Sequence, residues 1–293
     1  MTQLNNKIDF ALVFSVRNAN PNGDPLDGNR PRTTLDGRGE VSDVCLKRKI
    51  RNRLQDEGEK IFVQSDDRRN DDYRSLADRA KAVPELEKCR KDKNNEEYAR
   101  EACRIWYDVR AFGQVFAKSK STGKRKQKDG AEGEGAESDS MSIGVRGPVT
   151  IQSAYSVEPV SITDMQIVKS VNLETKPNPN DKASDRMGSK HRVDYGVYVT
   201  FGAINVQCAQ KTGFSREDAD LLKGALCTLF RNDATSARPD GSMEVLKLVW
   251  WEHACANGQY SSAKVHRCVE VTADGKVTVH PLEGLACEVI DGE

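Results

Sequence analysis

The sequence contains no run of apolar residues close to the ~20 that a helix needs to cross a bilayer. Residues 1–7 are polar and lack the apolar stretch of a secretory signal peptide. Hydrophobic residues make up 37% of the 293 residues and charged residues 31%, so the chain is polar but has enough apolar side chains for a core. We therefore expect a cytoplasmic protein that does not contact a membrane.

None of the eight cysteines belongs to a CxxC pair. In a chain of this length without a signal peptide, we interpret them as reduced thiols distributed over core and surface. The pairs His253 with Cys255 and His266 with Cys268 have spacings that do not match common zinc sites. We expect these four residues to alternate along strands, and we expect no bound metal.

The sequence also lacks GxSxG, Walker and HExxH motifs, and its four histidines are dispersed along the chain. A single loop aspartate, such as Asp24 or Asp27, would suit a metal-dependent ribonuclease, but one aspartate does not define a catalytic centre. We therefore expect a protein that is not an enzyme and needs no cofactor.

The formal net charge is zero, so total charge gives no indication of a nucleic-acid partner, but basic residues cluster locally. The densest cluster falls in a helix predicted at 43–57, which has Ser42 as N-cap and an apolar stripe of Leu46, Ile50 and Leu54. We expect the cations around it to lack nearby acidic partners and to contact phosphate, although a solvated helix face is the alternative. These cations are Lys47, Arg48, Lys49, Arg51 and Arg53, with Arg30, Arg32 and Arg38 upstream.

Apolar residues alternate over residues 8–16, which predicts a half-buried strand with Asp9 on its other face. A loop over 18–39 follows and is dense in Asn, Gly, Asp and Pro, each of which favours tight turns. Loops of this length in a compact domain tend to be functional.

Three interpretations of that loop stay open. It is a connector held by Asx turns, a calcium loop, or a surface of backbone amides and asparagines that binds RNA phosphate and ribose. The alternation Asn18, Asn20 and Asn22 resembles the first half of an EF-hand loop, but position twelve is Asn29 instead of Glu, and a strand precedes it. Arg17, at the end of the strand, would reach the same RNA surface.

Residues 58–117 have a charged, largely helical pattern, and residues 118–140 change from basic to acidic with low complexity, which predicts a mobile loop. After residue 141 the pattern is again that of strands. A polar stretch at 169–192 predicts a projecting hairpin, and a strand over 193–203 follows. We predict a helix at 215–230 and three more strands, at 245–251, 265–271 and 276–280.

Without residues 58–140, the predicted order is strand, helix, strand, strand, helix, strand, which is that of an α+β, ferredoxin-like or RRM-like fold. Tyr195 and Phe201 share one face of the strand at 193–203. Aromatic residues on such a sheet can stack bases, but alternation with Val193, Val197 and Val199 favours a place in the core.

The segment Asn20-Pro21-Asn22-Gly23-Asp24-Pro25, followed by Asn29-Arg30-Pro31-Arg32, resembles the signature of CRISPR Cascade backbone subunits and, more narrowly, of the type I-C member. Three further stretches agree with this resemblance, which extends over nearly the whole chain. They are YDVRAFG at 107–113, GVRGPV at 144–149, and Gly213-Phe214 leading into Ser215-Arg216-Glu217-Asp218.

The resemblance implies an RRM-like palm formed by residues 1–57 and 141–293, a helical finger insertion at 58–140, and a β-hairpin thumb at about 163–192. Copies of such subunits stack head to tail along CRISPR RNA and hold its backbone without reading sequence. The guide then pairs with target DNA. Further implied partners are other type I-C Cascade subunits and a recruited helicase-nuclease, which does the cutting.

The thumb candidate has cations at its base and a methionine that would wedge between bases, since an unbranched apolar side chain fits such a gap. The alternative is an exposed loop with an incidental methionine. Arg146 is flanked by glycines, which permit close backbone approach to RNA or only a plain turn. The thumb residues concerned are Met165, Lys169, Met187, Lys190, His191 and Arg192.

Overall fold

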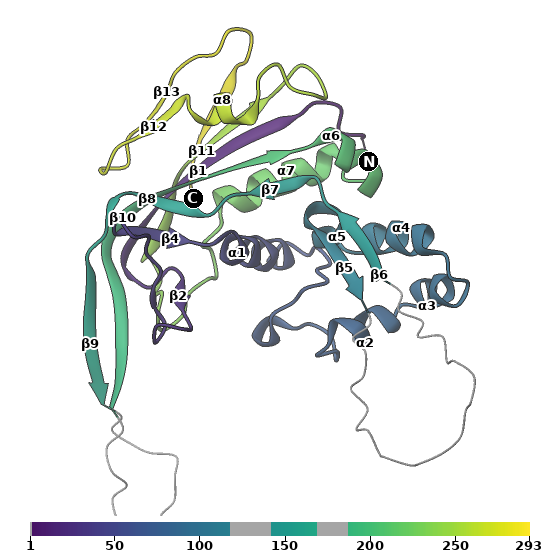
Figure 1. The fold of residues 1–293 in the computed structure, drawn as a ribbon, viewed down its shortest axis with the longest axis horizontal. Coiled ribbons are helices and arrows are strands. Elements are labelled where there is room, and N and C mark those ends of the chain that lie inside the picture. The colour runs from purple at the N-terminus through teal and green to yellow at the C-terminus, as the bar shows by residue number, and fades with distance from the viewer. Residues whose placement is uncertain (1, 118–141, 169–186) are drawn as a thin grey trace, which may run out of the picture.

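The computed structural model describes residues 2–117, 142–168 and 187–293 (Figure 1). Their main feature is an eight-stranded sheet whose pairs are all antiparallel, with the central order β14-β11-β1-β10-β8-β4 and with β7 and β9 also paired to β10. No helix in these three ranges is long and apolar enough to span a membrane. The strands are β1 (Ile8–Ala19), β4 (Arg38–Val41), β7 (Val149–Ile151), β8 (Ala154–Pro159), β9 (Ile162–Val168), β10 (Met187–Ile204), β11 (Met243–Glu252) and β14 (Cys287–Asp291).

The helices α1 (Asp43–Asp56) and α7 (Arg216–Cys227) pack on one face of this sheet. The predicted N-cap of α1 is confirmed, because Ser42 Oγ accepts a hydrogen bond from Cys45 N at 3.3 Å. At α7, Ser215 and Asp218 form a reciprocal capping box. Along the chain, β1, α1, β8, β10, α7 and β11 follow the predicted alternation of strands and helices, and the mixed α/β class is confirmed.

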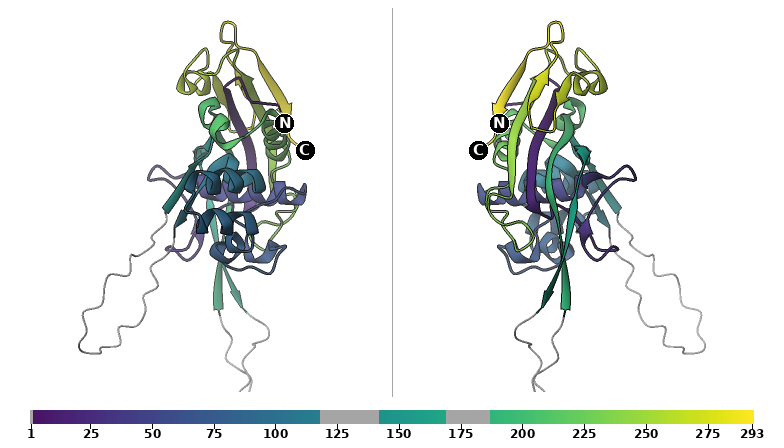
Figure 2. Two further views of the ribbon diagram at one scale, coloured as in Figure 1. Left: turned by 90° about the vertical axis from the view of Figure 1, so that its right-hand side faces the viewer. Right: turned by 90° about the vertical axis from the view of Figure 1, so that its left-hand side faces the viewer.

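Strand β1 is buried on both faces, so the prediction of a half-buried strand is wrong. Its residues Phe10, Leu12 and Phe14 face the two helices, as the alternation predicted. Ala11 on the other face is also buried, under the C-terminal part of the chain. The reason is position: β1 lies between β10 and β11, and a second layer covers one end of the sheet. Figure 2 shows this layer beside the strands.

That C-terminal layer consists of α8 (Ser262–His266), β12 (Val269–Val271) and β13 (Val277–Val279). The helix α6 (Val206–Thr212) does not belong to it, because its Ala209 packs in the main core with α1 and α7. The strand predicted at 265–271 is therefore wrong in its first part, because Val265 and His266 belong to α8. Ser261 caps this short helix by accepting a hydrogen bond from Lys264 N at 3.4 Å. The layer packs on Val249 and Trp251 of the sheet.

The inserted region contains four α-helices and a two-stranded hairpin within the described residues. It has its own apolar cluster around Phe62, Tyr98, Trp106 and Ile143. Strand β6, which the sequence division left with the palm, pairs with β5 of the insertion. The predicted loop at 118–140 lies outside the described residues. The elements are α2 (Leu76–Lys81), α3 (Pro84–Lys91), α4 (Asn95–Ile105), α5 (Tyr107–Phe112), β5 (Gly113–Ala117) and β6 (Ser142–Arg146), with a 3-10 turn at Asp66–Arg68.

The YDVRAFG and GVRGPV stretches pack against each other. A Cβ atom on Gly113 would lie 2.3 Å from Val145 O, and one on Gly147 would lie 2.3 Å from Ala111 O. The two backbones therefore approach so closely that only glycine fits at either position. Gly147, beside Arg146, is therefore needed for the close contact between these two segments of the chain.

Asp9 lies fully buried in a polar cluster that joins β1 to the C-terminal layer. Its Oδ2 is 2.8 Å from His253 Nε2 and 2.9 Å from Lys7 Nζ. His266 Nε2 lies 3.5 Å from Oδ1. Gln259 N donates to His253 Nδ1 at 2.9 Å, so the ring proton of a neutral His253 is on Nε2, directed at Asp9. Two of the histidines that are dispersed in sequence therefore meet at one carboxylate.

Burial by itself raises the pKa of the Asp9 carboxyl, but side-chain hydrogen bonds outweigh it and hold the pKa well below its usual range. Asp9 is therefore charged at neutral pH, and its charge contributes to stability. The side chains that lower the pKa are His266, Ser262, Lys7 and His253, of which Lys7 and His253 lie within hydrogen-bond distance of Oδ2.

We expect Asp9→Asn to lower the free energy of unfolding by about 3 kcal/mol at pH 7, because it leaves Lys7 beside a neutral group in a buried site. Since the folded-state pKa is depressed, this stabilisation is present above about pH 4 and is lost as the pH falls below it. Urea unfolding followed by tryptophan fluorescence at several pH values measures both effects. The control Asp291→Asn removes an exposed partner of Lys247 and should change stability by less than about 0.5 kcal/mol. A variant as stable as the wild type at pH 7 would contradict the structural role of Asp9.

Candidate nucleic-acid interface

The loop predicted at 18–39 is folded around a small hairpin of β2 (Gly23–Asp24) and β3 (Arg30–Pro31). Asn20 is buried and donates from Nδ2 to Asn29 O at 2.7 Å. Asn22 Oδ1 accepts from both the backbone N and Oγ of Ser42, each at 2.9 Å. These two asparagines therefore hold the loop and the start of α1 together, and their side chains do not form the exposed RNA surface expected of them.

The same contacts count against a calcium site. The side-chain oxygen of Asn22 accepts hydrogen bonds from Ser42, so it is not directed at a metal position in the loop. Within the described ranges, no group of three or more His, Cys, Asp or Glu side chains converges on a possible metal position. Asn18 differs from the other two asparagines: it is exposed and has a positive φ of 51° at the end of β1.

A hairpin projects from the sheet beside this loop (Figures 1 and 2). Its arms are β9 and the first residues of β10, paired from Val168 with Met187 down to Ile162 with Val193. The sequence predicted a hairpin in this region, and Lys169 lies outside the described residues. Met187 is 67% exposed at the far end of the described arms. Met165 lies opposite Lys190 nearer the base.

Asp164 ties the loop to the base of the hairpin. Arg30 Nη1 lies 2.6 Å from Asp164 Oδ2, and His191 Nδ1 lies 2.7 Å from Oδ1. Hydrogen bonds from His191 and then from Arg30 lower the pKa of the Asp164 carboxyl. The loop and hairpin therefore form one continuous surface, and His191 acts within it as a partner of Asp164. Sequence reasoning missed Asp164, because its pairing depends on the hairpin register.

Cations from three segments lie around this base. Arg17 on β1 is exposed, and its guanidinium lies 4.8 Å from the centre of the Tyr195 ring. Arg32 contacts Asp24 at 3.3 Å, and Arg192 lies a long 3.8 Å from Asp194. Lys190 has no ion-pair partner in the described part of the chain. Arg17, Arg30, Arg32, Lys190 and Arg192 are named here the hairpin-base cations.

The core position predicted for Tyr195 is wrong, since 39% of this residue is exposed where the sheet continues into the hairpin. Phe201, six residues further along β10, is partly buried and stacks on His266 with ring centres 4.8 Å apart. The two aromatic residues differ because the C-terminal layer covers only one end of the sheet. Tyr195 therefore lies partly exposed among the hairpin-base cations, with the Arg17 guanidinium over its ring.

Four of the five cations of α1 pair with carboxylates, so the expectation that they lack acidic partners is wrong for these four; Arg48 instead donates to a carbonyl oxygen. Lys49 is 3% exposed and forms an ion pair with Asp233, and burial lowers its pKa. Arg51 Nε lies 2.9 Å from Asp108 Oδ2. These acidic groups stand 184 and 57 positions away in sequence, and for that reason the local pattern does not reveal them. The other contacts are Lys47 with Asp43 at 3.0 Å, Arg48 Nη1 with Val63 O at 2.6 Å, and Arg53 with Glu57 at 2.9 Å.

Arg146 is exposed at the end of β6, on the side of the molecule away from the hairpin (Figure 1). The structure therefore does not bring it together with the hairpin-base cations. It lines a separate cleft between α4, β6 and α6.

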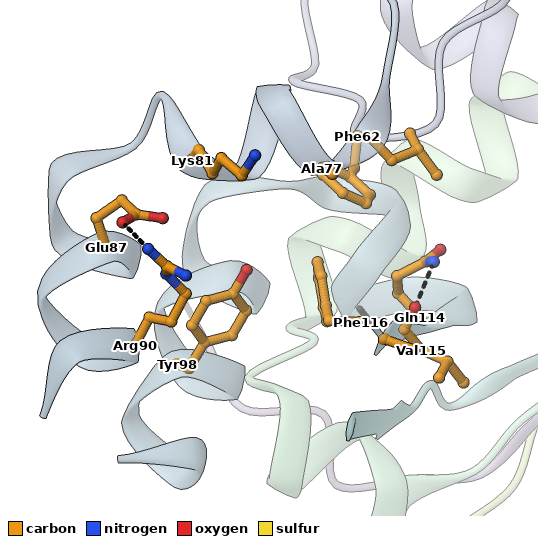
Figure 3. Close-up of a pocket in the computed structure, with 11 residues that line it drawn as sticks. Phe62, Ala77, Lys81, Glu87, Arg90, Tyr98, Gln114, Val115 and Phe116 are labelled. Atoms are coloured by element: carbon orange, nitrogen blue, oxygen red, sulfur yellow. Dashed lines mark hydrogen bonds and ion pairs between the residues drawn. The ribbon is translucent and has the colours of Figure 1, made fainter. Parts of the chain in front are cut away.

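The insertion also contains an apolar cleft of about 210 Å³, lined by Phe62, Tyr98, Phe116 and Val115 (Figure 3). At its rim Glu87 and Arg90 form an ion pair at 2.7 Å. Its walls are suited to an apolar side chain or a ring. The charged groups at its rim neutralise each other locally, so we do not include this cleft in the phosphate-binding surface.

Comparison with known proteins places the chain in a family. Residues 6–285 match the family model described as CRISPR-associated protein Cas7. A protein of Haloferax volcanii, named CRISPR-associated protein Cas7, is 25% identical over 296 residues, covering 99% of this chain and 82% of that protein.

Two solved structures are also similar. A chain of a "CRISPR RNA-guided surveillance complex, pre-nicking" is 15% identical with a TM-score of 0.47, covering 89% of this chain and 84% of that one. A chain of a "CRISPR RNA-guided surveillance complex" is 16% identical with a TM-score of 0.43, covering 92% and 77%. The family model matches nearly the whole sequence, and this protein therefore belongs to the Cas7 family of CRISPR-associated proteins.

Proposed function

We propose that this protein is a non-catalytic backbone subunit of a type I-C Cascade complex that binds CRISPR RNA along its phosphate backbone. The observation that carries the proposal is the group of hairpin-base cations, contributed by β1, the 18–39 loop and β10. Cations from three segments around one projecting hairpin suit a polyanion that passes the hairpin base. Arg17 is exposed, and the other four are partly exposed. The type I-C assignment rests on the resemblance of the NPNGDP segment.

In this proposal the sheet with α1 and α7 is an RRM-like palm. The helical insertion is the finger, and the β9–β10 hairpin is the thumb. Phosphate contacts position a protein on nucleic acid but carry no sequence information, so one subunit suits any guide. Met187, exposed on the thumb, is the better placed of the two methionines to wedge between bases, with Met165 nearer the base.

Copies of the subunit would stack along the guide RNA beside other type I-C Cascade subunits, and the guide would pair with target DNA. A recruited helicase-nuclease would do the cutting. The state of Asp24 supports a non-catalytic role for this chain. Its Oδ1 contacts Arg32 at 3.3 Å and accepts a hydrogen bond from Leu26 N at 3.0 Å. This carboxylate is therefore engaged in a turn and an ion pair.

The test of the hairpin-base cations is a mobility shift of CRISPR RNA across a salt series with magnesium present. We expect Arg17→Ala/Lys190→Ala/Arg192→Ala to weaken binding and to reduce the slope of log K against log salt by about 2, since each phosphate contact on a single strand contributes about 0.7. Arg231→Ala/Lys264→Ala/Lys276→Ala removes the same charge from exposed positions elsewhere on the molecule and serves as control.

Equal slopes for the two triple variants would count against the interface. RNA fragments at regular spacing, produced by the wild type and absent after Asp24→Ala, would overturn the non-catalytic assignment. Intact RNA in discrete shifted bands is the result we expect.

The buried ion pairs of α1 predict a different behaviour for that helix. We expect Lys49→Met to lower the free energy of unfolding by about 2 kcal/mol, while Asp233 keeps its contact with Arg238 at 3.1 Å. The salt slope of RNA binding should stay that of the wild type. Lys47→Ala, which removes a partly exposed i,i+4 pair, should change stability by less than about 0.5 kcal/mol. A Lys49→Met variant of wild-type stability with a reduced slope would restore α1 as a phosphate contact.

A further inference from the structure

A second basic site lies where the insertion meets the rest of the chain. A cleft of about 560 Å³ opens between α4, β6 and α6, which are distant in sequence. Among the residues that line it are three cations, one from each element: Arg100 of α4, Arg146 of β6 and Lys211 of α6. Glu96 is the one carboxylate of the lining, so the cleft carries an excess of positive charge.

Two of these cations are available to a ligand. Arg146 and Lys211 are exposed, and neither has an ion pair or hydrogen bond through its charged group within the described ranges. Arg100 contacts Glu97 on its own helix at 2.6 Å, an exposed i,i+3 pair of the kind that contributes little to stability. In contrast, the cations of α1 contact acidic side chains or a carbonyl oxygen. The cleft therefore differs from the surface of α1, where the cations already have partners.

The backbone beside these cations is also accessible. Gly144 in β6 lines the cleft, and a Cβ atom added to it would meet no atom within 4 Å. A phosphate group can thus approach the strand where Arg146 projects, without a side chain in the way. The tight packing of Gly113 on Val145 holds this part of β6 in place.

The cleft is separated from the thumb, so a polynucleotide must extend across the subunit to contact both. Of the elements that line the cleft, α4 and β6 belong to the insertion, which lies on one side of the sheet, and the β9–β10 hairpin projects on the other side (Figures 1 and 2). A polynucleotide that is held at only one of these places leaves the other without a counter-charge. A backbone that extends across the subunit would supply phosphates to both.

We propose that the cleft between α4, β6 and α6 is a second phosphate-binding site, in which Arg146 and Lys211 contact the backbone of a polynucleotide. This inference rests on the proposed function and extends it to a site apart from the thumb. The phosphates have two possible sources, the guide RNA itself or the DNA strand paired with it. Both offer the same chemistry to the two side chains.

The test uses Arg146→Ala/Lys211→Ala in the full chain, with two probes: single-stranded CRISPR RNA and the same RNA annealed to its complementary DNA. We expect the slope of log K against log salt to fall by about 1.4 on the single strand if the guide supplies the phosphates, from two contacts of about 0.7 each. If the paired DNA strand supplies them, the slope falls only on the hybrid. The charge-preserving Arg146→Lys/Lys211→Arg should keep most of the wild-type slope on both probes.

Arg231→Ala/Lys264→Ala is the matched control for loss of two exposed cations, and circular dichroism checks that each variant is folded. Wild-type slopes on both probes, with the hairpin-base triple variant still impaired, would overturn this inference and leave the proposed function standing. If neither the hairpin-base triple variant nor the cleft double variant reduces the slope, the proposed function is overturned instead. If the slopes are unchanged but the stepwise bands on long RNA are lost, the cleft contacts an acidic protein surface instead of phosphate. This result would also overturn the inference.

Discussion

The arrangement of this molecule depends on two buried charges of opposite sign in α5. Asp108, 1% exposed, accepts hydrogen bonds from the backbone N of Phe62 and of Val63 and pairs with Arg51 of α1. Arg110 contacts Asp218 of α7 at 2.7 Å. A buried charge without its partner is costly, so both contacts form together or the helix does not dock. One short helix thus fixes the insertion against both helices of the sheet and sets the position of β6 relative to the hairpin.

The same requirement explains why the basic helix α1 is a poor guide to function. Its periodic apolar stripe and its cap are local features, and both were predicted from the sequence and confirmed. Lys49 pairs with Asp233, and Arg51 pairs with Asp108. The fold brings these two carboxylates to α1 from distant parts of the sequence, so the residues around α1 do not reveal them. A run of cations along one helix therefore indicates available phosphate contacts only if the tertiary structure supplies no carboxylates.

For both the fold and the site, features that depend on neighbouring residues could be predicted from the sequence, and features that depend on tertiary contacts could not. The alternation of β1, the N-cap at Ser42 and the existence of the hairpin could be predicted because each depends on neighbours in sequence. The double-sided burial of β1, the meeting of His253 with Asp9, and the helix at Val265 were not, because the C-terminal layer decides them. At the site, Arg17 contacts Tyr195 and Arg30 contacts Asp164, and a shared RNA surface for these two arginines stays a prediction. The side chains of Asn20 and Asn22 are occupied internally, and the role of each predicted residue in binding RNA is still a prediction.

A protein of zero net charge can bind a polyanion if its carboxylates are paired inside the protein and some of its cations are not. Carboxylates such as Asp108, Asp218 and Asp233 are neutralised inside the protein by cations, and so contribute little to the outer field. The cations without a carboxylate partner in the described ranges include Arg17 and Lys190 at the hairpin and Arg146 and Lys211 at the cleft. Because screening limits each charge to about 8–10 Å at physiological salt, a phosphate responds to these local groups and not to the total. The two separated positive regions that we propose as phosphate sites are therefore compatible with a net charge of zero.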